Sequence, residues 1–387
     1  MSTGAAPTTS GSVEDRNTFS RPRAKGSIST ALSQPLLSIE ECAVVASGAE
    51  GRATIPVARS HNSRAPSQMS LIAAIRVDIC CRRAATEALA PMRELLDRHS
   101  VPATWCVATG PDRSGLALSN ALLEPGFSRR MLRVNPLRTY GLRSLVAGTL
   151  LPAETIFSAD VAKALIEMGA AGHEVALHGH DHRAWQNRIG RWPNERIAAD
   201  LEASRAAIDS AGIEARGSAA PAWRATELSV EALSGLGLLW ASDLRAREPL
   251  RLVNSGGKQQ GPPQIPVNLP TCDELIAWPD VGSADRASTL AGMVRTLVSL
   301  PPPIPPLIYC AHPEVDALID SRPLQRFVEL LRAEGGRFAT LGEIAVGLTD
   351  RLPLRRLKRA RCRGRGGWVA TDGSELPWLQ HFGGELG

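Results

Sequence analysis

The stretch Met69-Ser-Leu-Ile-Ala-Ala-Ile-Arg-Val-Asp78 is a compact apolar run that ends in a carboxylate. Such a run is typical of a strand buried on both faces of a parallel sheet. Segments with strand and helix patterns alternate from this point to the neighbourhood of Thr340. Repeated strand-helix units predict an α/β fold with a parallel sheet, and this many units in one chain favour a barrel.

The expected elements follow from the length and spacing of the apolar segments. Strands are expected at Ile72 to Ile79, Ala103 to Ala108, His173 to His178, Gly217 to Trp223, Leu238 to Asp243, Ile265 to Leu269, Pro306 to His312 and Arg337 to Thr340. Helices are expected at Ala84 to Arg98, Asn194 to Ala211, Thr226 to Ser234, Ala284 to Leu300 and Pro323 to Glu334. The Arg-rich stretch Ser128 to Arg143 is expected to be an elaborated loop over one end of the barrel.

The composition is ordinary for a globular chain of 387 residues, with 43% hydrophobic and 21% charged residues. No stretch of eighteen uncharged apolar residues occurs, and the N-terminus lacks the regions of a signal peptide. The seven cysteines do not have the spacing of a disulfide framework. We therefore expect no transmembrane span and a cytoplasmic location.

Charge and composition vary along the chain. The 44 basic and 39 acidic side chains give a net charge of +5, but eight basic and no acidic side chains lie between Arg351 and Arg365. The rest of the chain therefore carries −3, which argues against a nucleic-acid binder. Residues 1–68 have the composition of a disordered extension. Three parts are expected: this extension, a barrel over 69–350 and a basic tail over 351–387.

Four of the eight histidines fall between His173 and His182, directly after an apolar strand. His178 and His182 flank a turn at the end of that strand, where two neutral imidazoles can converge on one metal ion. Taken alone, the spacing is equally compatible with solvated loop histidines. His180 points away from its neighbours and is not expected to be a ligand.

Polar side chains also stand where other expected strands end. Asp78, Asp243 and His312 close three strands, and Arg224 follows a fourth. Because the strand ends of a parallel barrel open onto one face, these side chains can meet in one cleft. Each residue alone also has a structural explanation, as a helix cap, a surface partner or a buried histidine.

At these residues the chain resembles the NodB-like polysaccharide deacetylase superfamily, whose pattern combines a strand-end Asp pair, His-x-x-x-His, a later Arg motif and a final His. In more detail it is similar to the 4-deoxy-4-formamido-L-arabinose-phosphoundecaprenol deformylase family. The matching motifs are Gly110-Pro111-Asp112, Met131-Leu132-Arg133 with Asn135, Tyr140-Gly141, Ala147-Gly148-Thr149, Ala184-Trp185-Gln186, Trp223-Arg224-Ala225, and Ile265-Pro266-Val267 with Leu269-Pro270-Thr271.

The resemblance implies a distorted (β/α) barrel in which a divalent metal activates water against an N-acyl group. It also implies that Asp78 is the general base and that Arg224 pairs with Asp78 and keeps it ionised. Asp243 would orient His312, and His312 would protonate the departing amine, because an amide nitrogen leaves poorly as an anion.

One position departs from the family pattern. Where the family has Asp-x-Asp, with the second carboxylate on the metal, this chain reads Asp78-Ile79-Cys80. Strand alternation puts Asp78 and Cys80 on the same face. A thiolate binds zinc, so Cys80 with His178 and His182 is a plausible catalytic set that favours zinc over harder ions. The alternative is loss of the third ligand and of activity.

The resemblance further implies a hydrolase that removes formyl from 4-deoxy-4-formamido-L-arabinose on undecaprenyl phosphate, for lipid A and lipopolysaccharide modification and antibiotic resistance. The basic run Arg351 to Arg365 would attract the enzyme to the anionic cytoplasmic face of the inner membrane, unless it is only a solvated tail. No nucleic-acid partner is expected. Two alternatives remain open: a deacetylase of another lipid-linked or polymeric amino sugar, and a catalytically silent lipid-sugar binding protein permitted by Cys80.

Overall fold

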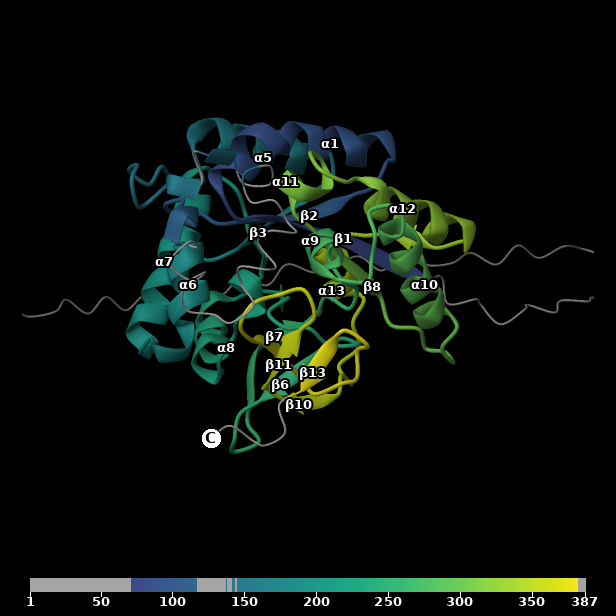
Figure 1. Ribbon diagram of the computed structural model, residues 1–387. Helices are drawn as coiled ribbons and strands as arrows, with labels where there is room; N and C mark the ends of the chain where they lie inside the picture. The colour runs from purple at the N-terminus through teal and green to yellow at the C-terminus, as the bar shows by residue number, and fades with distance from the viewer. Residues whose placement is uncertain (1–70, 117–136, 138–140, 143–144, 382–387) are drawn as a thin grey trace, which may run out of the picture. The chain divides into compact units, whose positions relative to one another are not determined.

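The computed structural model describes residues 71–116, 137, 141–142 and 145–381. Its strand β1 (Ile72–Ile79) is buried at every residue but the first. β1 pairs in parallel with β2 (Ala103–Val107) and with β8 (Leu307–Ala311). β9 (Arg337–Phe338) also pairs with the start of β1. The apolar run that begins this part of the chain is therefore a buried strand that is paired on both edges (Figure 1).

The main sheet continues beyond β2 in a mostly parallel arrangement. Its further strands, in spatial order, are β3 (Glu174–Leu177), β4 (Gly217–Ser218), β5 (Trp240–Ala241), β7 (Gln259–Gln264), β6 (Leu250–Val253) and β10 (Leu354–Arg356). Within this sheet the pairing of β6 with β7 is antiparallel, whereas the other pairings between described strands are parallel. The expected α/β class is confirmed, and the sheet is consistent with a distorted barrel.

Asn268 links β8 to the chain beyond β7, two segments that strand pairing does not join in the described residues. Its Nδ2 donates to the carbonyl oxygen of Pro306 at 2.9 Å, and its Oδ1 accepts from the backbone N–H of Ile308 at 2.8 Å. A side-chain amide can satisfy both a donor and an acceptor of an open strand edge. One asparagine thus takes the place of a strand pairing at this point, and the barrel is distorted here.

Helices connect many of the strands and pack around the sheet (Figure 1). Thr226, Thr271 and Thr340 each begin one of them with a capping box, in which the side chain accepts from a backbone N–H three residues later. In the described ranges, no helix is both long enough and apolar enough to cross a bilayer. The helices are α1 (Leu89–Arg98), preceded by a π-helical turn at Ala84–Ala88, α5 (Ala159–Ala170), α6 (His182–Arg188), α7 (Asn194–Ser210), α8 (Glu227–Leu233), α9 (Cys272–Ala277), α10 (Arg286–Val298), α11 (Pro313–Asp316), α12 (Arg322–Ala333) and α13 (Leu341–Val346).

The C-terminal region differs from the expected tail. β10 joins the main sheet beside β6, and β11 (Lys358–Cys362), β12 (Val369–Thr371) and β13 (Leu379–His381) form a second, antiparallel sheet. Alternation along β11 buries Ala360 and Cys362 and leaves basic side chains outside. The basic run is therefore part of the folded structure.

The strand expected at Ile265 to Leu269 does not form. In its place, the chain makes one bridge, between Arg245 and Val267, and the unexpected hairpin of β6 and β7 precedes it. The expected extension over residues 1–68 lies outside the described residues, as does most of the loop Ser128 to Arg143.

Candidate metal centre and active site

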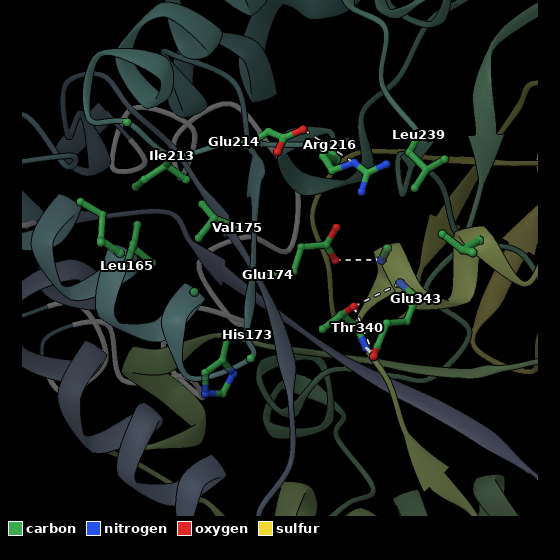
Figure 2. A pocket seen from close by; sticks show the side chains of 16 residues that line it. Leu165, His173, Glu174, Val175, Ile213, Glu214, Arg216, Leu239, Thr340 and Glu343 are labelled. Atoms are coloured by element: carbon green, nitrogen blue, oxygen red, sulfur yellow. Dashed lines mark hydrogen bonds and ion pairs between the residues drawn. The ribbon is translucent and has the colours of Figure 1, made fainter. Parts of the chain in front are cut away.

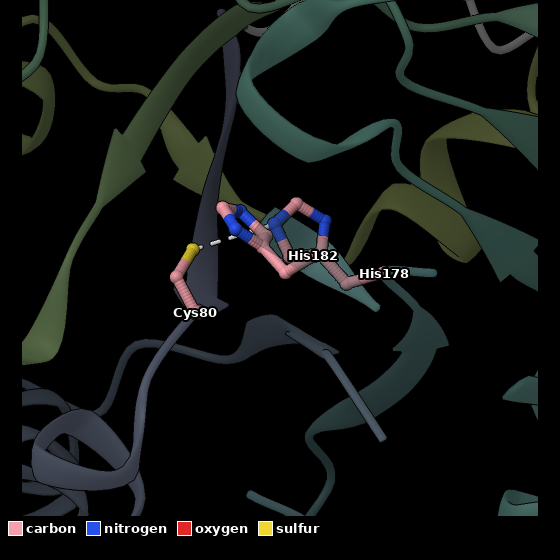
Figure 3. A group of neighbouring side chains, drawn as sticks. All are labelled: Cys80, His178 and His182. Carbon is pink, nitrogen blue, oxygen red and sulfur yellow. Dashed lines mark hydrogen bonds between the residues drawn. The ribbon is translucent and has the colours of Figure 1, made fainter. Parts of the chain in front are cut away.

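The three predicted metal ligands meet beyond the ends of β1 and β3, the two strands on either side of β2. Cys80 follows β1, His178 follows β3, and His182 opens α6. Their Sγ and ring nitrogen atoms lie within 4.8 Å of one another, and Sγ of Cys80 is 3.4 Å from Nε2 of His178 (Figure 3). On a tetrahedral zinc ion with bonds of about 2.0 to 2.3 Å, a sulfur and a nitrogen ligand are roughly 3.5 Å apart. The arrangement of these side chains fits such an ion.

Both imidazoles are neutral and have the electronic form of metal ligands. Nδ1 of the buried His178 donates to the carbonyl oxygen of Ala219 at 2.8 Å, which leaves the lone pair on Nε2 facing Cys80. Burial lowers the pKa of His178 to about 4, and burial together with His178 lowers the pKa of His182 well below its usual value. Nε2 of His182 is buried and has no hydrogen-bond partner among the described residues. A metal ion would satisfy this nitrogen.

Cys80 is a thiol that needs a cation to become a ligand. Its burial and the neighbouring Asp78 carboxylate raise the pKa of the thiol well above its usual value. A divalent ion supplies the positive charge that stabilises a thiolate, and binding then releases the thiol proton.

Asp78 is paired with Arg76, which lies two residues earlier on the same face of β1. Nε and Nη2 of Arg76 donate to Oδ1 and Oδ2 of Asp78 at 2.7 and 2.6 Å. Burial alone would raise the pKa of Asp78, but the guanidinium holds it well below its usual range. Oδ2 lies 3.6 Å from Nε2 of His178, so this carboxylate adjoins the candidate ligands. The predicted pairing of Asp78 with Arg224 is wrong.

Arg224 instead contacts the C-terminal region. Its Nη1 donates to the carbonyl oxygen of Gln186 at 2.6 Å, and its Nη2 donates to that of Gly366 at 3.3 Å. The backbone passes through positive φ at Ala222 and Trp223, immediately before Arg224. The extended strand expected up to Trp223 therefore ends earlier, and its alternation does not direct Arg224 toward Asp78.

His312 follows β8 and is paired with Asp273 of α9. Nδ1 of His312 lies 3.1 Å from Oδ1 of Asp273. Burial would lower the pKa of His312, but the Asp273 carboxylate outweighs burial and the pKa rises to about 9. A ligand-type nitrogen of His312 also lies within 4.8 Å of Asp78 and Cys310. The prediction that Asp243 orients His312 is wrong, because Asp273 is in contact with its ring.

Asp243 supports the backbone on the other side of the centre. Its Oδ1 accepts from the backbone N–H of Ala220 at 2.8 Å, and its Oδ2 accepts from Nε2 of Gln264 at 3.1 Å. Burial raises the pKa of Asp243 to about 6. Ala220 follows Ala219, whose carbonyl accepts from His178, so Asp243 stabilises the segment that orients this imidazole.

Three residues at the centre have no role assigned from the sequence: Arg76, Asp273 and Glu314. Arg76 could have been found, because it shares a strand face with Asp78. Asp273 could not be paired with His312 from spacing alone, since they come from different elements. Glu314, two residues after His312, is buried with a raised pKa, and its Oε2 has no hydrogen-bond partner within the described ranges.

A cavity of about 520 Å³ lies at the opposite end of β3 from His178 (Figure 2). Glu174 lines it, and its carboxylate accepts from Trp240 at 2.9 Å and from Thr104 and the backbone of Gly342 at 2.8 Å each. These bonds join the start of β3 to its surroundings. Glu174 thus has a structural role, away from the candidate metal centre.

The chain is similar to known proteins in sequence and in fold. A sequence model described as polysaccharide deacetylase matches residues 73–239. A protein of Shewanella sediminis named "Probable 4-deoxy-4-formamido-L-arabinose-phosphoundecaprenol deformylase ArnD" is 25% identical over 303 residues, which are 78% of this chain and 95% of that protein. The protein of the same name from Wigglesworthia glossinidia brevipalpis is 26% identical over 281 residues, 72% of this chain and 94% of that protein.

Among solved structures, a crystal structure described as "putative polysaccharide deacetylase from Mycobacterium smegmatis" aligns with a TM-score of 0.50. Its sequence identity is 16%, and the alignment covers 76% of this chain and 95% of that chain, so the likeness concerns the fold. The mostly parallel α/β sheet agrees with the sequence matches, because the aligned deacetylase has a similar fold. The polysaccharide deacetylase match over residues 73–239 and the two deformylase-named relatives support a NodB-like family for this chain.

Proposed function

We propose that the protein is a metal-dependent deformylase that hydrolyses the N-formyl group of undecaprenyl-phosphate-linked 4-deoxy-4-formamido-L-arabinose, for lipid A modification. One observation carries the proposal. Cys80, His178 and His182 converge beside Asp78, and His312 adjoins that carboxylate, in a chain that covers nearly the whole length of relatives with that name. A ligand cluster with a carboxylate and a protonated imidazole beside it suits the hydrolysis of an amide.

Cys80, His178 and His182 would hold the metal, and zinc is favoured because a thiolate is a soft ligand. When bound, a divalent ion polarises the formamide carbonyl and makes water a better nucleophile at neutral pH. Asp243 contributes by bracing Ala220, next to the carbonyl that orients His178. Arg224 has no part in the proton transfers of this proposal.

Asp78 and His312 divide the proton transfers. Asp78, kept ionised by Arg76, accepts a proton from the water whose oxygen attacks the formyl carbon. His312 donates a proton to the sugar nitrogen as the carbon–nitrogen bond breaks. Its Nδ1 faces Asp273, so Nε2 is the donating nitrogen. The products are formate and the 4-amino sugar.

The same residues are compatible with two other functions. A deacetylase of another amino sugar would use the same water, base and acid. A silent lipid-sugar binding protein is favoured by one observation, the raised pKa of the Cys80 thiol, because a thiol that keeps its proton is not a ligand.

We place the enzyme at the cytoplasmic face of the inner membrane, where its lipid-linked substrate would lie. Exposed basic side chains on β10 and β11 support this: Arg355, Arg356, Lys358 and Arg361. At roughly 1 kcal/mol for each basic residue near an anionic surface, a few engaged side chains would recruit the protein reversibly.

Parallel assays of formate and acetate release distinguish the three functions. The full-length, zinc-loaded protein is incubated with the methyl glycoside of 4-deoxy-4-formamido-L-arabinose and with its acetamido counterpart. We expect formate to be released at least about tenfold faster than acetate, a difference of roughly 1.4 kcal/mol in barrier. Faster release of acetate would support the deacetylase. Binding of the glycosides without release of either acid would support the silent protein.

A further inference from the structure

The turn Arg363–Gly367, between β11 and β12, approaches α9 closely. Gly364 has a φ of +86°, and a Cβ there would lie 2.6 Å from the carbonyl oxygen of Glu274. Gly367 has a φ of +71°, and a Cβ there would collide with Nη2 of Arg224. Both positions therefore require glycine, for conformation and for space. The approach places the side chain of Arg365 next to the acidic residues of α9.

Arg365 is mostly buried and bonded to two carboxylates. Its Nε donates to Oε1 of Glu274 at 2.6 Å, and its Nη2 lies 3.4 Å from Oδ2 of Asp273. The guanidinium also lies 4.4 Å from the centre of the Trp223 ring. A buried arginine with several partners has a fixed orientation, so it can fix the orientation of a carboxylate.

Asp273 connects Arg365 to His312 through its two different oxygens. Oδ2 faces Arg365, whereas Oδ1 lies 3.1 Å from Nδ1 of His312 and accepts from Oγ1 of Thr271 at 2.6 Å. The carboxylate would lose a partner on one side if Arg365 were removed. It could then rotate about its terminal torsion, which is broad and soft for aspartate.

Trp223 contacts both Arg365 and the arginine of the Arg76–Asp78 pair. Arg76 lies 5.1 Å and Arg365 lies 4.4 Å from the centre of the Trp223 ring. The rings of His312 and Trp223 are also nearly perpendicular, with centroids 6.5 Å apart. The acid and the base of the proposed reaction thus each have an arginine–aspartate pair of their own.

We propose that Arg365 is a positioning residue for the catalytic acid, holding Asp273 so that Oδ1 faces Nδ1 of His312. This inference rests on the proposed function, in which His312 protonates the leaving amine. It gives the C-terminal sheet a part in the reaction, because the turn between its first two strands carries Arg365.

The test compares two substrates that differ in their need for an acid. Hydrolysis of the formamido glycoside requires protonation of the leaving nitrogen, whereas 4-nitrophenyl acetate releases 4-nitrophenolate without a proton. In the full-length, zinc-loaded protein, Arg365→Gln is expected to lower kcat for the amide by about 10- to 100-fold, part of what an acid contributes. KM, bound zinc and ester hydrolysis are expected to stay within about threefold of the parent, since the acid serves neither binding nor ester cleavage.

A double variant tests whether Arg365 acts through Asp273. Asp273→Asn removes the partner, so Arg365→Gln is expected to cause no further loss of amide hydrolysis in that background. Arg286→Gln is the matched control. It removes a partly buried arginine of α10, which pairs with Asp320 at 3.0 Å. It is expected to leave both rates unchanged. If Arg365→Gln does not fold, Arg365→Lys keeps the charge but not the forked geometry and is expected to show the same selective loss.

Several outcomes would overturn the inference. These are equal losses on the amide and the ester, an unaffected Arg365→Gln variant, or single losses that multiply in the double variant. If the parent does not hydrolyse the amide, the proposed function fails and this inference fails with it. Amide hydrolysis by the parent together with one of the first three outcomes would overturn the role of Arg365 alone.

Discussion

Cys80 lies two residues after Asp78 and directly beyond the end of β1, with its sulfur 3.4 Å from Nε2 of His178. Such a position is that of a ligand, but the partly buried thiol ligates only after losing its proton. The chemistry of this single side chain decides between a zinc enzyme and a silent binding protein.

Substitution of Cys80 tests this choice. Cys80→Ala is expected to lower zinc retention at least tenfold and formate release by about two orders of magnitude, because a three-residue site loses one ligand. Cys80→Asp is expected to retain activity and to accept harder metals, since oxygen replaces sulfur. Bound metal after dialysis and formate release are the measurements. Cys81→Ala is the control, as Cys81 is buried outside the ligand cluster; undiminished zinc in Cys80→Ala would refute ligation.

The pH dependence of turnover tests the acid. His312 acts when protonated, and its pKa is raised to about 9 by Asp273. Activity is therefore expected to persist at neutral pH and to fall as the pH rises through about 9. Asp273→Asn removes the negative charge, so the pKa of His312 decreases and the fall in kcat moves to lower pH by at least about one unit. Asp243 contacts Ala220 and Gln264, so Asp243→Asn is expected to leave the pH at which kcat falls unchanged. If the pH at which kcat falls is the same in Asp273→Asn as in the parent, the pairing of Asp273 with His312 is excluded.

Among the elements, those with a continuous apolar pattern could be predicted from the sequence. β1, β2 and β8 are buried runs, and their bounds agree with expectation to within a residue or so. β7, with the sequence Gln-Gln-Gly-Pro-Pro-Gln, has no strand pattern, and it forms because β5 and β6 pair with it.

For the candidate site, the sequence predicts which residues share one face of the sheet, but not all of their side-chain partners. Residues at strand ends could be assigned to one face, since parallel strands open together. Arg76 could also have been paired with Asp78, because the two share a strand face. The partner of His312 could not be predicted, because Asp273 reaches it only through the placement of α9, and Arg224 is turned away by positive φ before it. Side-chain pairs between elements depend on packing that one sequence does not display.

The C-terminal sheet is expected to be necessary for stability, in contrast to a solvated tail. Deleting residues 358–387 removes buried side chains, among them Val369, Trp378 and Leu379. Because each large buried side chain contributes about 1.5 to 3 kcal/mol, the free energy of unfolding is expected to fall by several kcal/mol. Denaturant unfolding measures this change. A control with Arg355→Gln and Arg356→Gln, both exposed, should unfold like the parent. A truncated chain as stable as the parent would contradict the packing described here.

In the whole molecule, which has a net charge of +5, basic side chains are concentrated on β10 and β11, and these two strands contain no acidic residue. We expect the protein to sediment with anionic liposomes at low salt and to be released at high salt, because the Debye length shortens from about 30 Å at 0.01 M to about 3 Å at 1 M and the attraction is then screened. Replacing Arg355, Arg356, Lys358 and Arg361 by Gln is expected to abolish sedimentation. Neutral phosphatidylcholine liposomes are the control, and sedimentation of the Gln variant like the parent would exclude this surface as the cause.

The proposed function requires hydrolysis of a formamide at the centre formed by Cys80, His178 and His182. The most direct test measures formate released from undecaprenyl-phosphate-linked 4-deoxy-4-formamido-L-arabinose by the full-length protein, first freed of metal with a chelator and then supplied with one equivalent of zinc. Formate release is expected only after zinc is added and is expected to be lost in His182→Ala. Formate release that is undiminished in the chelated protein, or none from protein that has bound its zinc, would contradict the proposed function.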